Sequence, residues 1–136
     1  MITELQPKFE TVMIIDDNIT DLYVYSRMIT KNNFGKNVLE YSVATEAMQY
    51  LQDNQDNFSV LPQIIFVDIY MPLMSGFEFL EDYDKLSPAL KAHCRVYIVS
   101  STIDNEDIVK SHSDMNVVSF QVKPITKEFL DRIKGN

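Results

Sequence analysis

The sequence predicts a doubly wound α/β domain, and three features support this prediction. Two apolar runs, residues 11–15 and 64–67, lack polar alternation, as expected for strands buried on both faces of a parallel sheet. Both runs end in acidic residues, namely Asp16-Asp17 and Asp68. Strand-like and helical segments alternate along the chain, which favours right-handed crossovers that cover both faces of the sheet.

The first half of the chain supplies two strands and two helices. After the first strand, Asn18 can cap a helix, whose apolar face would be Ile19, Leu22, Tyr23, Ser26 and Ile29. Residues 32–35 end this helix. Residues 38–43 form a second strand that is less apolar, so we expect it at the edge of the sheet. Residues 44–52 form the next helix.

The second half begins with the strand that ends at Asp68. Ser75 and Glu78 have the spacing of a capping box, which predicts a helix from there to residue 86. Ser87-Pro88 then begins a short helical segment. We expect strands at 95–99 and 117–122, and a weakly amphipathic helix over 104–113 with Ile108 and Val109 inward. The last helix, 126–134, would bury Phe129, Leu130 and Ile133.

Composition limits the classes of function. The 136 residues suit one domain, with residues 1–9 as an extension and 10–134 as the folded unit. The net charge of −8 disfavours binding to nucleic acid. Cys94 is the only cysteine, so no internal disulfide can form. No apolar stretch approaches the roughly 20 residues that cross a bilayer, and no signal peptide is recognisable. We expect a soluble, cytoplasmic protein.

Polar residues follow the ends of the buried strands. Asp16, Asp17, Asp68, Ser100 and Lys123 would meet at one edge of the sheet, beside the switch point between the first and third strands. Three carboxylates repel one another unless a cation is bound or a proton is shared. Oxygen ligands of this kind favour Mg²⁺ or Mn²⁺ over zinc. The amine and the hydroxyl suit a phosphoryl group.

These motifs resemble those of one family, the receiver domains of two-component response regulators. The matching segments are residues 14–18 and 67–76, together with Ser100 and Lys123-Pro124. Each motif is weak alone, but all four stand in order, each at the end of its own strand. The resemblance covers residues 10–134. It implies a flavodoxin-like (βα)5 fold with strand order 2-1-3-4-5, in a stand-alone receiver that is not an enzyme beyond its own phosphorylation and dephosphorylation.

The resemblance also implies residue roles. Asp68 would accept a phosphoryl group from a histidine kinase or a phosphotransfer protein. Asp17 would bind Mg²⁺ directly, Asp16 directly or through water, and Asp68 and the main-chain carbonyl of Tyr70 would complete the ligands.

The remaining implied roles concern a switch in conformation that phosphorylation of Asp68 would cause. Lys123, aimed by a cis bond to Pro124, would pair with the phosphoryl oxygens. Ser100 would move toward the phosphate and Phe120 would follow it inward, changing a partner-binding surface over residues 100–134. The bulky Tyr70, together with Thr102, leaves the lifetime of the phosphorylated state open.

Other interpretations stay open at this point. Asp17 can be a simple helix cap, and Lys123 an exposed charge at the end of a strand. A magnesium-dependent phosphatase with an aspartyl nucleophile usually carries a second acid two residues after the nucleophile, where this chain has Tyr70. A flavin-binding electron carrier needs a phosphate-binding loop, which the acidic residues 16–17 would oppose. A degenerate receiver would bind partners without phosphorylation. Onward phosphoryl relay and docking are not distinguished.

Overall fold

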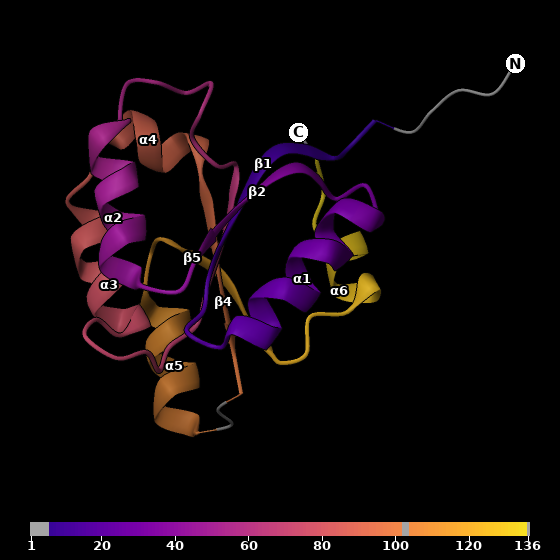
Figure 1. Cartoon of the computed structure of the whole chain (residues 1–136). Coiled ribbons are helices and arrows are strands. Elements are labelled where there is room, and N and C mark those ends of the chain that lie inside the picture. Colours follow the sequence, from indigo (N-terminus) through magenta and orange to yellow (C-terminus); the bar gives the residue numbers. More distant parts are fainter. Residues whose placement is uncertain (1–5, 102–103, 136) are drawn as a thin grey trace, which may run out of the picture.

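The computed structural model describes residues 6–101 and 104–135 and contains one parallel sheet (Figure 1). Its strand order is β2-β1-β3-β4-β5, and every neighbouring pair is parallel. The strands are β1 (Phe9–Ile15), β2 (Gly35–Tyr41), β3 (Ile64–Val67), β4 (Arg95–Ser100) and β5 (Val117–Val122). The doubly wound fold and the order 2-1-3-4-5 are therefore confirmed, and β2 lies at the predicted edge.

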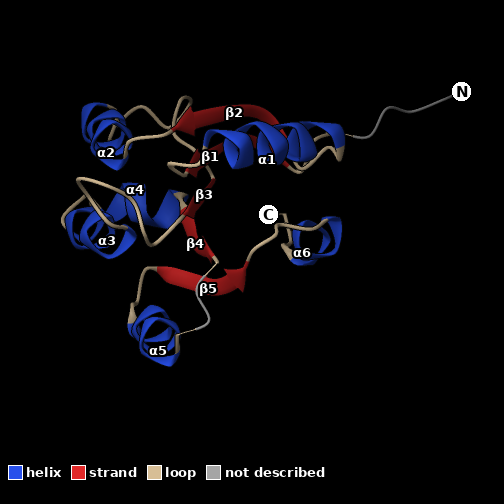
Figure 2. Ribbon diagram, turned by 60° about the horizontal axis from the view of Figure 1, so that its bottom comes forward, coloured by secondary structure: helices blue, strands red, loops and turns tan. Residues whose placement is uncertain are grey.

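Helices cover both faces of the sheet (Figure 2). The described helices are α1 (Ile19–Lys31), α2 (Ala44–Asp53), α3 (Gly76–Asp84), α4 (Pro88–His93), α5 (Asn105–Ser113) and α6 (Lys127–Arg132). α1 and α6 lie on one face, and the other helices lie opposite. No helix in the described ranges is both long and apolar enough to cross a membrane.

The adjacent strands β1 and β3 contribute side chains to both hydrophobic cores, because alternate side chains of a strand point to opposite faces of the sheet. All four residues of β3 are buried, which explains the apolar run without alternation. Ile65 and Val67 join the core beneath α2, α3 and α4. Ile64 and Phe66 join the core beneath α1 and α6.

The predicted caps are present in the structure. The side chain of Asn18 accepts a hydrogen bond from the N–H of Asp21, and Ser75 and Glu78 form the reciprocal capping box. α1 ends at Lys31, and Asn33 follows with a φ of 55°. β2 begins at Gly35, three residues before the predicted start at residue 38.

Three side chains predicted to face inward are exposed instead. Ile19 and Tyr23 are 65% and 61% exposed, and Val109 is 66% exposed. The buried stripe of α1 is Leu22, Tyr25, Ser26 and Ile29. Tyr23 lies about 100° around the helix from Leu22, and Ile19 begins the helix at the edge of the sheet. In α5 Ser111 is buried and Ile108 is half-buried, so only Val109 departs from the predicted inward face.

Candidate functional site

Three carboxylates meet at the carboxyl edge of the sheet. Ile15 of β1 pairs with Val67 of β3, so the residues that follow them, Asp16 and Asp68, come side by side. Both are buried, at 3% and 7% exposure, while Asp17 is exposed. Oxygens of Asp16, Asp17 and Asp68 lie within 4.8 Å of one another. The predicted acidic cluster is therefore present.

Asp68 is held at both carboxylate oxygens. Its Oδ1 accepts a hydrogen bond from the N–H of Ile69 at 2.7 Å, and its Oδ2 lies 3.1 Å from the Lys123 ammonium. The loop after Asp68 folds back so that Gly76 donates a main-chain hydrogen bond to the Ile69 carbonyl at 2.7 Å. A Cβ atom at Gly76 would lie 2.3 Å from the carbonyl oxygen of Asp68, so this close approach requires glycine.

Lys123 reaches the cluster from the end of β5. Its N–H donates to the carbonyl of Ser100 on β4, and its bond to Pro124 is cis, as the resemblance implied. The ammonium lies 2.7 Å from Asp16, 2.8 Å from Asp21 and 3.1 Å from Asp68, measured from Nζ to Oδ2. Three carboxylates therefore share the charge of one lysine.

Asp21 is a site residue that sequence reasoning missed. It stands in the first turn of α1, where an acid is common because it interacts favourably with the helix dipole. The sequence signal that could have identified Asp21 was its position four residues after Asp17, a predicted site residue. Only the folded structure shows that Lys123, which directly follows β5, lies against the first turn of α1.

Burial and charge act in opposite directions on the ionisable groups. Burial raises the pKa of Asp16, and the nearby Asp68 charge adds to this, although hydrogen bonds from Lys123 and Asn18 oppose it. Burial lowers the pKa of Lys123, but its hydrogen bonds to Asp16 and Asp21 and the charge of Asp68 outweigh burial and raise it overall. Lys123 is thus a permanent cation in this site.

The acids present suit a divalent cation with oxygen ligands. Asp16, Asp17 and Asp68 offer carboxylate oxygens on one side of the site, and Mg²⁺ and Mn²⁺ prefer such ligands with some water retained. Asp16 already accepts hydrogen bonds from Asn18 and Lys123, one at each oxygen. Each carboxylate oxygen has a further lone pair for a ligand bond. The ligand role of the Tyr70 carbonyl stays a prediction.

The described residues assigned to the switch lie on β4, on or just after β5, and in the loop that follows Asp68. Ser100 is buried at 1% exposure, at the end of β4. Phe120 on β5 is half-buried and packs against the core beneath α2 and α3. The Tyr70 side chain is 59% exposed, and its hydroxyl donates a hydrogen bond to Asp107 of α5. Pro124 is exposed, and Thr102 lies outside the described residues.

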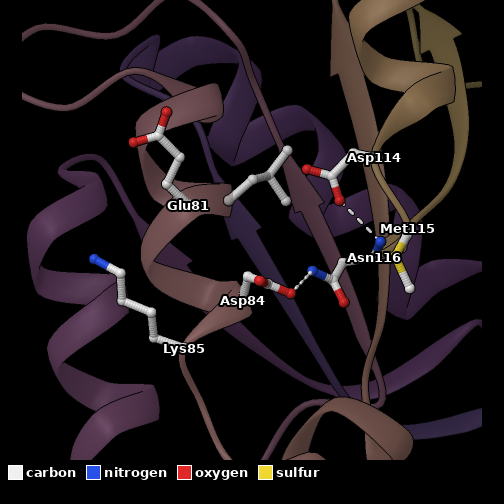
Figure 3. A pocket seen from close by; sticks show the side chains of 7 residues that line it. Glu81, Asp84, Lys85, Asp114, Met115 and Asn116 are labelled. Carbon is white, nitrogen blue, oxygen red and sulfur yellow. Dashed lines mark hydrogen bonds between the residues drawn. The ribbon is translucent and has the colours of Figure 1, made fainter.

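Figure 3 shows a hollow that is lined by none of the three acids of the cluster. It has a volume of about 480 Å³ and is lined from α3 and from the segment before β5. Asn116 donates a side-chain hydrogen bond to Asp84 at 2.9 Å, and its N–H donates to Asp114. This hollow lies at the start of β5, whereas the acids lie where β1 and β3 end, so it is not part of the site.

Known proteins share this sequence pattern and fold. Residues 12–133 match the model of the response regulator receiver domain. The probable methanogenesis regulatory protein FilR2 of Methanothrix harundinacea is 26% identical over 121 residues, which cover 89% of this chain and 76% of FilR2. The two-component response regulator ORR21 of Oryza sativa subsp. indica is 30% identical over 122 residues, which cover 90% of this chain. The chain spans only 16% of the length of ORR21.

Solved structures show the same fold. A response regulator receiver protein from Dyadobacter fermentans has a TM-score of 0.78 and 27% identity, with 89% of this chain and 91% of that chain covered. The CheX-CheY-BeF3-Mg²⁺ complex from Borrelia burgdorferi has a TM-score of 0.71 and 19% identity, with coverages of 88% and 81%. The Mn²⁺-bound form of response regulator Rcp1 has a TM-score of 0.69 and 19% identity, with coverages of 90% and 87%.

The family match spans nearly the whole chain, and the acids, the lysine and the strand order agree with it. The chain belongs to the response regulator receiver domain family of two-component signalling.

Proposed function

We propose that this receiver accepts a phosphoryl group on Asp68 and thereby switches a partner-binding surface. One observation carries the proposal: the Asp68 carboxylate lies in one acidic cluster with Asp16 and Asp17 while its Oδ2 contacts the Lys123 ammonium. A nucleophile, oxygen ligands for a cation and a fixed positive charge therefore occupy one small volume. Phosphoryl transfer depends mainly on such positioning and charge stabilisation.

In the proposed reaction, a carboxylate oxygen of Asp68 attacks the phosphorus of a phosphohistidine on a histidine kinase or phosphotransfer protein. An oxygen–phosphorus bond forms while the phosphorus–nitrogen bond breaks. The electron pair of the broken bond goes to the imidazole nitrogen, which takes up a proton. Hydrolysis reverses the switch: water attacks the phosphorus, the Asp68 carboxylate is restored and inorganic phosphate leaves. The protein is thus a switch rather than an enzyme acting on a separate substrate.

The residues around Asp68 prepare this step. The N–H of Ile69 and the ammonium of Lys123 fix the orientation of the carboxylate. Lys123 also offsets the negative charge that would otherwise repel a phosphoryl donor. Asp17, Asp16 and Asp68, with the Tyr70 carbonyl, would hold Mg²⁺ or Mn²⁺, and the bound cation supplies further positive charge to the phosphoryl oxygens. The Mg²⁺ and Mn²⁺ complexes of CheY and Rcp1 support this choice of cation.

The output surface would lie on α5, β5 and α6. Val109, Met115, Val118 and Val122 are exposed apolar side chains in this part of the chain, as a docking surface requires. Ser100 and Phe120 link this surface to the site, because they occupy β4 and β5.

The buried free thiol of Cys94 is compatible with a reducing compartment, and we propose a cytoplasmic location.

Intact-mass measurement after incubation with acetyl phosphate and Mg²⁺ tests the proposal. The wild type should gain one phosphoryl group, which hydroxylamine should remove because an acyl phosphate is labile to it. Asp68→Ala should gain none. Equal labelling of the two proteins would show that Asp68 is not the acceptor, and no labelling by any donor would contradict the proposed function.

A further inference from the structure

We propose that Asp21 is a positioning residue that restrains Lys123 and thereby slows phosphorylation of Asp68. This inference rests on the proposed function of Asp68. Asp21 belongs neither to the metal-binding acids nor to the phosphoryl-binding residues assigned above. Its carboxylate nevertheless lies 2.8 Å from the Lys123 ammonium, closer than the carboxylate of Asp68 at 3.1 Å.

The restraint follows from the hydrogen-bonding capacity of lysine. An ammonium group has three N–H donors, and three carboxylates lie within 3.1 Å of Lys123. Lys123 can therefore turn toward a phosphoryl oxygen only by giving up one of these carboxylates. The contact with Asp68 already directs the ammonium toward the site of phosphorylation. The carboxylate that Lys123 releases must therefore be that of Asp16 or Asp21.

A bound cation would leave Asp21 as the persistent competitor. Asp16 belongs to the group of acids that can hold a metal ion, whereas Asp21 does not. A cation on Asp16 would draw electron density from its carboxylate and weaken its hold on Lys123. Asp21 would keep its full charge and continue to attract the ammonium away from the phosphoryl position.

The N-terminal cap of α1 does not need the Asp21 side chain. The Asn18 side chain caps α1 by accepting from the Asp21 N–H, and the Asn18 N–H is bound by Asp16. The Asp21 carboxylate is therefore not needed to close a capping box. Its charge also reaches Tyr25, whose pKa is raised first by burial and then by Asp21. A negative charge here opposes an anionic phosphoryl donor as well as holding Lys123.

The test compares the rate of phosphorylation by acetyl phosphate, at fixed Mg²⁺, in the wild type and in Asp21→Asn. We expect the variant to react about threefold faster or more, the ratio that corresponds to losing one partly exposed ion pair. Asp21→Glu keeps the charge and should return the rate toward that of the wild type. Glu46→Gln removes a charge from the equivalent first turn of α2 and should change the rate little.

A second readout separates this inference from the proposed function. The NMR signal of the Lys123 ammonium should exchange with water faster in Asp21→Asn, because one hydrogen-bond partner is lost. Unchanged ammonium exchange, or a phosphorylation rate in Asp21→Asn that is equal to or below the wild-type rate, would overturn the inference. If the wild type itself accepts no phosphoryl group, the proposed function fails, and ammonium exchange still decides whether Asp21 restrains Lys123.

Discussion

The hydroxyl of Tyr70 donates a hydrogen bond to the carboxylate of Asp107, which joins the loop after Asp68 to α5. α5 has few apolar anchors, since Ser111 is its buried residue. The Lys110 ammonium adds a contact 4.4 Å from the centre of the Phe77 ring on α3. Polar contacts from the segment that follows Asp68 thus hold a helix that packs weakly on the sheet.

Removing the Tyr70 hydroxyl should loosen α5. We expect Tyr70→Phe to speed amide hydrogen exchange over residues 105–113, because weakly packed elements open locally at low free-energy cost. Hydrogen exchange followed by mass spectrometry measures this. Tyr23→Phe removes a hydroxyl from an exposed tyrosine on α1 and serves as the control. Equal protection of α5 in both variants would show that the Tyr70–Asp107 hydrogen bond does not stabilise the helix.

A methyl group at position 76 should distort the loop that carries Asp68. Gly76→Ala places a Cβ atom 2.3 Å from the Asp68 carbonyl oxygen, and main-chain atoms cannot move aside as a flexible side chain can. We expect the free energy of unfolding in urea to fall by about 1–3 kcal/mol. Gly135→Ala is the matched control, because its Cβ would meet the flexible Lys8 side chain at 3.1 Å. A Gly76→Ala protein as stable as the control would contradict this reading of the loop.

Cys94 should be protected in the folded protein. Burial raises the pKa of its thiol from 9.0 to about 12, although a hydrogen bond from Tyr83 opposes the shift. The unfolded thiol loses its proton first as pH rises, so the stabilising effect of this thiol is complete below about pH 9 and declines toward pH 12. A thiol reagent at about pH 8 should modify the native protein far more slowly than the urea-unfolded protein. Equal rates would show that Cys94 is accessible.

The fold was largely predictable because its signals are local. The apolar strands, the caps at Asn18 and Ser75, and the acids at the strand ends are written in short stretches of sequence. The acidic cluster followed from the rule that parallel strands end at one edge. The errors at Ile19, Tyr23 and Val109 arose where an apolar residue lies beside the buried stripe or at the end of a helix. Periodicity alone does not show how much of a helix the sheet covers.

The contacts between distant segments were not predictable. Asp21 and Lys123 are 102 residues apart in the chain, and Tyr70 and Asp107 are 37 apart. Each residue alone has an ordinary explanation, as a first-turn acid, a strand-end lysine, a loop tyrosine or a surface acid. The fold brings the end of β5 against the first turn of α1 and the loop after Asp68 against α5, and these contacts form the two pairs.

Occupation of the site should change amide hydrogen exchange in the second half of the chain. A beryllofluoride complex with Mg²⁺ mimics the phosphorylated state, and we expect it to change amide exchange mainly in residues 100–125. The physical reason is that, in the proposed switch, the phosphoryl group would favour a second arrangement of Ser100 and Phe120 and so shift the population between two states. Asp68→Ala under the same conditions provides the control. Changes confined to residues 69–76 would mean that the surface of α5, β5 and α6 is not the output.

The most direct test of the central claim is to locate the phosphoryl group on the chain. Borohydride reduces an acyl phosphate on aspartate to homoserine, so peptide mapping after phosphorylation and reduction identifies the acceptor. We predict homoserine at position 68 and unmodified aspartate at positions 16, 17 and 21. Homoserine at one of those three positions, or its absence from position 68 in a protein that has gained a phosphoryl group, would contradict the assignment of Asp68.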